Sequence, residues 1–211
     1  MNIQALLFDL DGVITESSTA HFQAWQEVAL TYGIQIPDDF ESSLKGISRR
    51  NSVLRILEKT GKSLSEEAIE AFMKQKNDRY LGLIAGFTKD HRLPGVQAIF
   101  EWAQSRSLQT ALVSASKNGP RLLQALEMTE WFDVIVDPTE HPSKPAPDLF
   151  LAAAKALHVP PEACLAFEDA NAGIEAIQAA GMTAIGIGDA LDADYLFAHL
   201  KDAHAFLSTK F

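Results

Sequence analysis

The chain has 211 residues, 47% hydrophobic and 22% charged, proportions that are ordinary for a soluble globular protein of one or two domains. Its formal net charge of −10 argues against general binding to nucleic acids or anionic membrane surfaces. No apolar run approaches the roughly 18 residues of a membrane span, and the start of the chain lacks the basic and apolar regions of a signal peptide. We therefore expect a cytoplasmic protein.

The first predicted element is a strand over residues 3–9, where an apolar run leads to Asp9 and Asp11 and then breaks at Gly12. Such a run is typical of a buried parallel strand, whose carboxyl end lies at the edge where α/β sheets bind ligands. Two carboxylates two residues apart point to the same side and repel each other unless a cation or a shared proton intervenes. Taken alone, Asp11-Gly12 is equally consistent with a simple turn.

Three helices are predicted next, over residues 19–32, 49–60 and 65–81, because apolar side chains recur there at helical spacing. Gly33 and Gly61 follow the first two as stop signals. No strand pattern interrupts this part of the chain. The sequence therefore predicts an all-helical segment placed directly after the first strand.

From Leu93 onward, helical and strand patterns alternate. Helices are predicted over residues 95–105, 118–128, 146–158 and 171–180, and strands over residues 108–113, 133–136, 164–167 and 183–187. This succession predicts an α/β fold with a Rossmann-like parallel sheet covered by helices on both faces. We expect residues 1–15 and 88–211 to form this core and residues 16–87 to form an inserted cap that acts as a lid over the sheet edge.

Polar side chains also follow the later strands. The loop from Ser114 to Asn118 offers hydroxyl and amide groups beside a helix start, Lys144 lies in a proline-stiffened loop, and Glu168-Asp169 is a second acidic pair. Each has a simpler interpretation, as a helix cap, a solvated charge or helix-start chemistry. Together, two acidic pairs indicate a magnesium site, and the serine and lysine indicate phosphate binding.

These residues resemble, in chain order, the four motifs of the haloacid dehalogenase superfamily of phosphotransferases. The matching motifs are Phe8-Asp9-Leu10-Asp11-Gly12, Ser114, Lys144 and Glu168-Asp169. Within that superfamily the chain resembles the β-phosphoglucomutase family over nearly its whole length, in residues 11–15, 21–25, 44–49, 114–120 and 143–148. The resemblance implies the haloacid dehalogenase type of core with an all-helical cap inserted after the first strand.

The resemblance implies roles for the acidic residues. Asp9 would be the nucleophile that becomes an aspartyl phosphate, and Asp11 the general acid and base. Mg²⁺ would be held by the Asp9 carboxylate, the backbone carbonyl of Asp11 and Asp169, with Glu168 in support. At the adjoining hinge, Glu16-Ser17 stands where the family usually has Asp-Thr, which bears on how firmly Asp11 is held.

The resemblance also implies phosphate and sugar contacts. The transferring phosphate would be held by Ser114, the Ala115 amide and Lys144, and the non-transferring phosphate by Arg49, Ser116, Lys117 and Asn118. His21 and Lys76 would contact the sugar or steer Asp11, and Trp25, Lys45, Gly46 and Ser52 would line the cap side. In isolation, the simpler interpretations are favoured, with His21 as a surface residue, Trp25 as a core anchor, and Lys45, Arg49 and Arg50 as a solvated basic turn.

The activity implied is that of a phosphomutase interconverting β-D-glucose 1-phosphate and glucose 6-phosphate, with Mg²⁺ and β-glucose 1,6-bisphosphate as the activating intermediate. The alternative is a magnesium-dependent sugar phosphate phosphatase. A non-catalytic sugar phosphate binding module is disfavoured, because both Asp9 and Asp11 are present. We expect small-molecule sugar phosphates as partners, neither nucleic acid nor membrane, and a monomer.

Overall fold

The computed structural model describes residues 2–210. The strands among these residues form one six-stranded sheet in the order β3-β2-β1-β4-β5-β6, and every neighbouring pair is parallel. The strands are β1 (Ala5–Phe8), β2 (Gln109–Leu112), β3 (Val134–Ile135), β4 (Cys164–Glu168), β5 (Thr183–Ile187) and β6 (Tyr195–Phe197). This is the Rossmann order, in which the chain leaves the central strand in both directions and opens a crevice at its carboxyl end.

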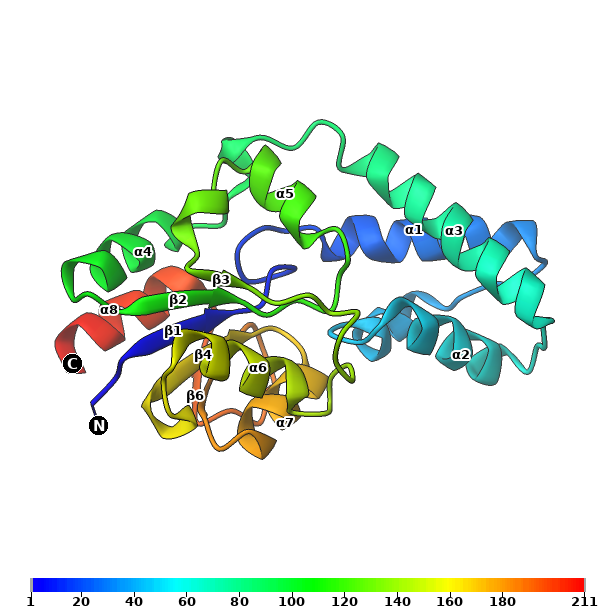
Figure 1. Cartoon of the computed structure of the whole chain (residues 1–211). Coiled ribbons are helices and arrows are strands. Elements are labelled where there is room, and N and C mark those ends of the chain that lie inside the picture. Colours follow the sequence, from blue (N-terminus) through cyan, green and yellow to red (C-terminus); the bar gives the residue numbers. More distant parts are fainter. Residues whose placement is uncertain (1, 211) are drawn as a thin grey trace.

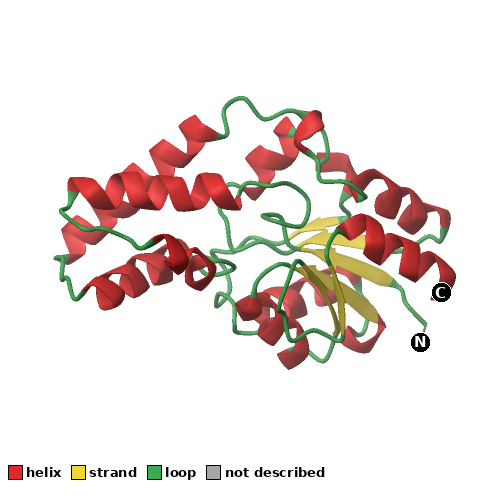
Figure 2. Ribbon diagram, turned by 180° about the vertical axis from the view of Figure 1, so that it is seen from behind, coloured by secondary structure: helices red, strands yellow, loops and turns green. Residues whose placement is uncertain are grey.

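Helices cover both faces of the sheet (Figure 2). Helices α4 (Val96–Ser105), α5 (Gly119–Ala125) and α8 (Leu200–Lys210) pack on one face, and α6 (Asp148–Leu157) and α7 (Asn171–Ala179) on the other. Short 3-10 helices η2 (Lys89–His91), η3 (Thr129–Trp131) and η4 (Pro161–Ala163) lie in the connections. The predicted α/β class and helical cover are therefore confirmed.

Strand β1 lies at the centre of the core, and its side chains alternate between the two faces. The Phe8 ring lies 4.8 Å from the Phe100 ring and 4.7 Å from the Phe167 ring, on the face covered by α4. Leu7 packs into the opposite cluster with α6 and α7. Because side chains alternate along a strand, Asp9 follows on the side of Leu7, at the point where the sheet ends.

The inserted segment consists of α1 (Ser18–Thr31), the 3-10 helix η1 (Asp38–Leu44), α2 (Arg49–Thr60) and α3 (Glu66–Leu83), which stand beyond the carboxyl edge of the sheet (Figure 1). These elements share a separate hydrophobic cluster that includes Trp25, Ile56 and Phe72. The helical cap predicted after the first strand is therefore present, with a core of its own.

The two chain segments that join the cap to the sheet lie side by side. Thr15 is fully buried and forms isolated bridges with Asp11 and Arg92, and its hydroxyl donates to the His91 carbonyl at 2.7 Å. This contact anchors both connections next to Asp11.

Three parts of the prediction differ from the structure. The helix predicted over residues 118–128 ends at Ala125, because Glu127 adopts a left-handed φ of 53° and the Met128 amide bonds back to Leu123. The 3-10 helices were not predicted. After Gly188, where no helix or strand was predicted, the chain forms edge strand β6 and α8, which packs against α4.

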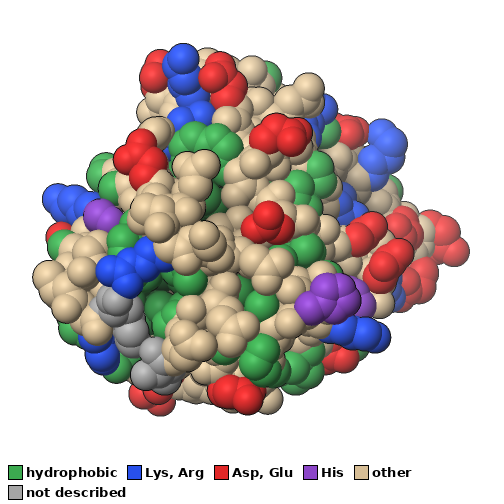
Figure 3. Space-filling view, turned by 60° about the vertical axis from the view of Figure 1, so that its left-hand side comes forward, with side chains coloured by type: hydrophobic (Ala, Val, Ile, Leu, Met, Phe, Trp, Pro, Cys, Tyr) green, Lys and Arg blue, Asp and Glu red, His purple; other side chains and the backbone are tan. Residues whose placement is uncertain are grey.

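Over residues 2–210, none of the helices combines the length and apolarity needed to cross a membrane. On the face shown in Figure 3, acidic and basic side chains are interspersed with neutral ones, and hydrophobic side chains appear in small groups. This pattern agrees with the interior location of the large apolar side chains.

Candidate active site

The register of the sheet brings the carboxylates of Asp9 and Glu168 together. Phe8 pairs with Leu112 on β2 and with Phe167 on β4, so Asp9 lies level with Val113 and Glu168. Parallel strands in register end at the same edge, so residues far apart in sequence become neighbours there. The predicted convergence of Asp9 and Glu168 follows directly from this pairing.

Lys144 lies between Asp9 and Glu168 and contacts both. Its fully buried ammonium lies 2.6 Å from Asp9 Oδ1 and 2.5 Å from Glu168 Oε1, and it donates to the Val113 carbonyl at 2.8 Å. Burial opposes the charged amine, but the two carboxylates outweigh it and raise the pKa of Lys144. The lysine therefore stays charged beside the strand ends.

Asp9, Glu168 and Asp169 form a cluster in which one carboxylate oxygen from each residue lies within 4.8 Å of those from the other two. Glu168 Oε2 accepts hydrogen bonds from the amides of Asp169 and Ala170, at 2.8 and 3.0 Å. Hard carboxylate oxygens at this spacing fit Mg²⁺. Because Glu168 is already engaged through both oxygens, Asp9 and Asp169 are the more available ligands.

Gly12 makes room for this cluster. Its φ is +84°, and a Cβ there would lie 2.1 Å from Asp169 Oδ2. A side chain at this position would therefore strain the backbone and displace the Asp169 carboxylate. The glycine that ends the first motif is explained by this close approach.

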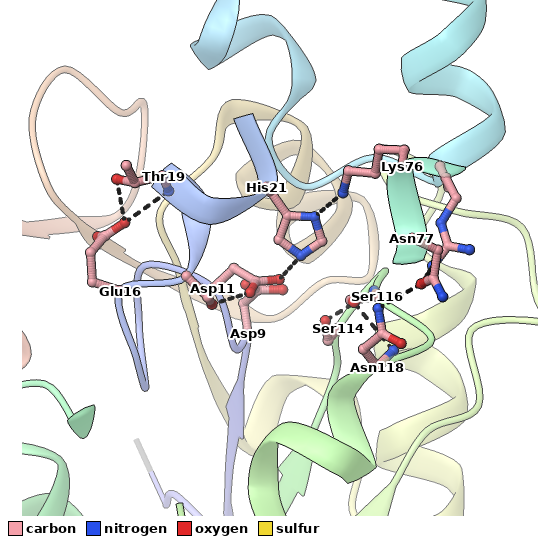
Figure 4. A network of polar contacts seen from close by, with 12 residues as sticks. Asp9, Asp11, Glu16, Thr19, His21, Lys76, Asn77, Ser114, Ser116 and Asn118 are labelled. Carbon is pink, nitrogen blue, oxygen red and sulfur yellow. Dashed lines mark hydrogen bonds and ion pairs between the residues drawn. The ribbon is translucent and has the colours of Figure 1, made fainter. Parts of the chain in front are cut away.

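Asp11 occupies a different environment from Asp9. Ser17 donates a hydrogen bond from its hydroxyl to Asp11 Oδ1, and His21 Nε2 lies 3.7 Å from Asp11 Oδ2 (Figure 4). Burial, and then the charge of Asp9, raise the pKa of Asp11 to about 7. Near neutral pH this carboxyl group can therefore both give and take a proton.

His21 lies between Asp11 and Lys76 (Figure 4). Lys76 is only 2% exposed, and its Nζ lies 2.5 Å from His21 Nδ1 and 4.8 Å from the centre of the Trp25 ring. Burial, and then the charge of Arg49, lower the pKa of Lys76 to about 7. Burial and Lys76 also lower the pKa of His21 well below its ordinary value, so the imidazole is neutral.

Replacing Lys76 with methionine should alter how stability depends on pH. The pKa of Lys76 is about 7 when folded and 10.5 ordinarily, so between these values the unfolded chain binds more protons and stability rises with pH. Below pH 7 the Lys76 amine is charged in both the folded and the unfolded chain, so the folded protein bears the full cost of burying that charge. We expect Lys76→Met to be more stable than wild type at pH 6, and this advantage to shrink by about 2 kcal/mol between pH 7 and 9.

Urea denaturation across this pH range measures the difference. Lys74→Met is the matched control, because Lys74 lies on the same helix with 79% of its side chain exposed. Parallel pH curves for wild type and Lys76→Met would contradict the lowered pKa.

The loop after β2 is ordered by its own side chains. Ser114 Oγ accepts a hydrogen bond from the Ser116 amide at 3.1 Å, and Ser116 Oγ accepts one from the Asn118 amide at 3.3 Å. A hydroxyl that accepts still has its own hydrogen to donate. Ser114 can therefore donate to an anion in front of Asp9.

A second group of donors lies where the cap meets this loop. Arg49, the first residue of α2, donates from Nη2 to Asn77 Oδ1 at 2.6 Å, and Asn118 Nδ2 donates to the same oxygen at 3.1 Å. Asn77 was not identified from the sequence. No local pattern marks it, because it stands among polar residues on α3 and its role depends on the neighbours it meets across the cap.

A cavity of about 580 Å³ lies between the sheet edge and the cap. Most of the predicted site residues line it, namely Asp9, Asp11, His21, Trp25, Lys45, Gly46, Arg49, Ser52, Lys76, Ser114, Ala115, Ser116, Lys117 and Asp169. Lys144 and Glu168 lie fully buried beneath it, and Asn118 is joined to it through Asn77. Trp25 also packs against Phe72, with ring centres 5.6 Å apart, so it anchors the cap core as well.

The cap also touches the core at the acidic cluster. Lys45 Nζ lies 2.8 Å from Asp169 Oδ2. Gly46 has a φ of +72°, and a Cβ there would lie 3.1 Å from the Ala170 Cβ. Ser52 donates from Oγ to the carbonyl of Ser48, the N-cap residue of its own helix, at 3.1 Å.

The haloacid dehalogenase-like hydrolase family model matches residues 3–181. The chain belongs to that family. The resemblance of the strand-end motifs to the haloacid dehalogenase superfamily is therefore confirmed.

Individual members of the haloacid dehalogenase-like family are similar over nearly the whole chain. The β-phosphoglucomutase of Bacillus subtilis is 39% identical over 206 residues, covering 95% of this chain and 91% of that protein. The fructose-1-phosphate phosphatase of Escherichia coli is 32% identical over 184 residues, covering 86% of this chain and 95% of that protein. A β-phosphoglucomutase crystal structure from Clostridium difficile has a TM-score of 0.93 and 38% identity, covering 99% of this chain and 96% of that one.

Proposed function

We propose that this haloacid dehalogenase-like protein is a β-phosphoglucomutase. It interconverts β-D-glucose 1-phosphate and glucose 6-phosphate through a phosphorylated Asp9 and a β-glucose 1,6-bisphosphate intermediate. The similarity to β-phosphoglucomutases from Bacillus subtilis and Clostridium difficile supports this activity.

The observation that carries the proposal is the presence of two separate sets of groups, each suited to bind a phosphate, around one cavity. Ser114 and Lys144 are placed with Asp9, whereas Arg49 and Asn118 meet at Asn77 where the cap joins the core. A phosphatase needs only the first set, because water accepts the phosphoryl group. A mutase must hold a bisphosphate by both ends, so it needs the second set as well.

In the proposed reaction, the Asp9 carboxylate attacks phosphorus and the bond from phosphorus to the sugar oxygen breaks. Asp11 gives its proton to that oxygen, and later takes a proton from the sugar hydroxyl that attacks the aspartyl phosphate. A pKa of about 7 for Asp11, raised by burial, suits both directions. Lys144 and Ser114 offset the negative charge on the transferring phosphate.

Asp9, Asp169 and the backbone carbonyl of Asp11 would hold Mg²⁺, and Glu168 would support them through the hydrogen bonds it accepts from the Asp169 amide and from Lys144, which also contacts Asp9. When bound, the ion supplies positive charge that offsets the phosphate oxygens. Lys144, which is fully buried, also contacts Asp9 at Oδ1.

The cap residues give the proposed site its selectivity. His21 and Lys76 would orient Asp11 and contact the sugar, and Lys117 and Ser116 would add donors for the second phosphate.

We propose residues 16–87 as the cap domain, with residues 1–15 and 88–211 as the core, since the cap has its own hydrophobic cluster. We also propose that the protein acts in the cytoplasm, because charged sugar phosphates are retained there. A monomer is part of the same proposal.

The second candidate is a sugar phosphate phosphatase, favoured by the similarity to the Escherichia coli fructose-1-phosphate phosphatase. An assay of purified protein with β-glucose 1-phosphate, Mg²⁺ and a trace of β-glucose 1,6-bisphosphate separates the two. We expect glucose 6-phosphate to form without a matching release of inorganic phosphate. Phosphate release without glucose 6-phosphate would establish the phosphatase instead.

Replacing Arg49 with alanine should impair the mutase cycle by roughly 10- to 100-fold, the effect of losing hydrogen bonds to a charged group. Hydrolysis of acetyl phosphate, which carries one phosphoryl group and no second anion, should change little. Arg55→Ala is the matched control, because Arg55 lies on the same helix and its exposed side chain donates to the Ser43 carbonyl. Equal losses in both assays would argue against a role for Arg49 at the second phosphate.

A further inference from the structure

Asn77 joins the two halves of the second phosphate-binding set. It projects from α3 in the cap, and its Oδ1 accepts hydrogen bonds from Arg49 Nη2 at 2.6 Å and Asn118 Nδ2 at 3.1 Å. Arg49 belongs to the cap and Asn118 to the loop after β2. Figure 4 shows Asn77 facing Asn118 across this junction, on the side away from Asp9.

The orientation of the Asn77 amide follows from its neighbours. A guanidinium has donors only, so Asn77 must present its oxygen to Arg49. A carbonyl oxygen has two lone pairs, and Arg49 and Asn118 use both. The donors of Arg49 and Asn118 are therefore both held at the Asn77 side-chain oxygen.

A neutral acceptor has a specific advantage here. Arg49 uses one N–H for Asn77 and retains its positive charge and its other donors for an anion. A carboxylate at position 77 would accept the same hydrogen bonds, but its charge would offset that of the guanidinium. Asn77 thus holds Arg49 without competing with a phosphate for its charge.

We propose that Asn77 is a positioning residue for the non-transferring phosphate. By holding Arg49 of the cap against Asn118 of the core, it assembles their donors into one anion-binding pair only when the cap contacts the core. The inference rests on the proposed mutase function, and it assigns to Asn77 the coupling between cap closure and recognition of the second phosphate.

Another asparagine provides a matched control. Asn51 Nδ2 donates to Ser143 Oγ at 3.2 Å, so it too connects the cap to the core. This contact involves neither Arg49 nor a residue of the proposed catalytic set. Loss of a cap-to-core hydrogen bond can therefore be separated from loss of the Arg49 position.

The test compares Asn77→Ala, Asn77→Asp and Asn51→Ala with wild type. The mutase kcat and KM for β-glucose 1-phosphate are measured beside the hydrolysis of acetyl phosphate. For Asn77→Ala we expect KM to rise about 10-fold, the equivalent of one hydrogen bond to a charged group, with a smaller change in kcat and normal acetyl phosphate hydrolysis. Asn77→Asp should raise KM at least as much, although it keeps both acceptor positions, and Asn51→Ala should leave KM unchanged.

Three results would overturn the inference. Asn77→Ala with the KM of Asn51→Ala would show that Asn77 only contributes to cap docking, and Asn77→Asp with the KM of wild type would show that a neutral acceptor is not required. A parallel loss of acetyl phosphate hydrolysis in Asn77→Ala would also overturn it, by indicating general damage. Failure of the proposed function is distinguishable, because wild type itself would then form no glucose 6-phosphate.

Discussion

Replacing Asp9 with asparagine is expected to lower both mutase turnover and phosphate release by roughly 10⁴-fold or more, the scale seen when a catalytic nucleophile is removed. An amide is a poor nucleophile, and it can no longer form an acyl phosphate at this position. The coupled assay measures turnover, and intact-protein mass spectrometry measures the phosphorylated enzyme.

The same substitution also tests the buried charge cluster. Asp9 and Glu168 both lie within hydrogen-bond distance of Lys144, so asparagine leaves that buried ammonium with a single carboxylate. We expect a lower stability for Asp9→Asn than for the control Asp137→Asn, whose carboxylate caps an exposed turn at Thr139. A normal yield of phosphorylated protein from Asp9→Asn would exclude Asp9 as the nucleophile.

Replacing Asp11 with asparagine is expected to lower turnover by about 10²- to 10⁴-fold, the usual contribution of a general acid and base. The amide can neither protonate the departing sugar oxygen nor take a proton from the incoming hydroxyl. Binding of Mg²⁺ and of glucose 6-phosphate, measured by isothermal titration calorimetry, should be preserved, since the Asp11 backbone carbonyl is unchanged. Near-normal mutase turnover in Asp11→Asn would remove the side chain from the mechanism.

The pH profile gives a second readout for Asp11. Burial and Asp9 raise its pKa to about 7, so the acid form falls and the base form rises as the pH passes through neutrality. Because the two half-reactions need opposite forms, wild-type turnover should be greatest near pH 7 and decline on both sides. The residual activity of Asp11→Asn should lose this maximum.

Much of the fold could be predicted from local patterns. The apolar run before Asp9, the alternation of helices and strands after Leu93, and the uninterrupted helical stretch between them each depend on periodicity within about 15 residues. The predicted end of this helix, at residue 128, was three residues too late, because the observed helix ends at Ala125. The left-handed residue that follows is Glu127, and many residue types can adopt that conformation when tertiary packing favours it. Strand β6 has only three residues and lies at the sheet edge, where periodicity is weak.

Local sequence patterns predict which residue types lie at the strand ends, and the family resemblance assigns them roles. How these residues meet follows from the tertiary fold alone: Lys144 contacts Asp9 across 135 residues of chain, Lys45 contacts Asp169 across 124, and Asn77 meets Asn118 across 41. Such contacts depend on strand register and on how the cap packs over the sheet. These features arise from the summed burial of many side chains, so no short motif encodes them.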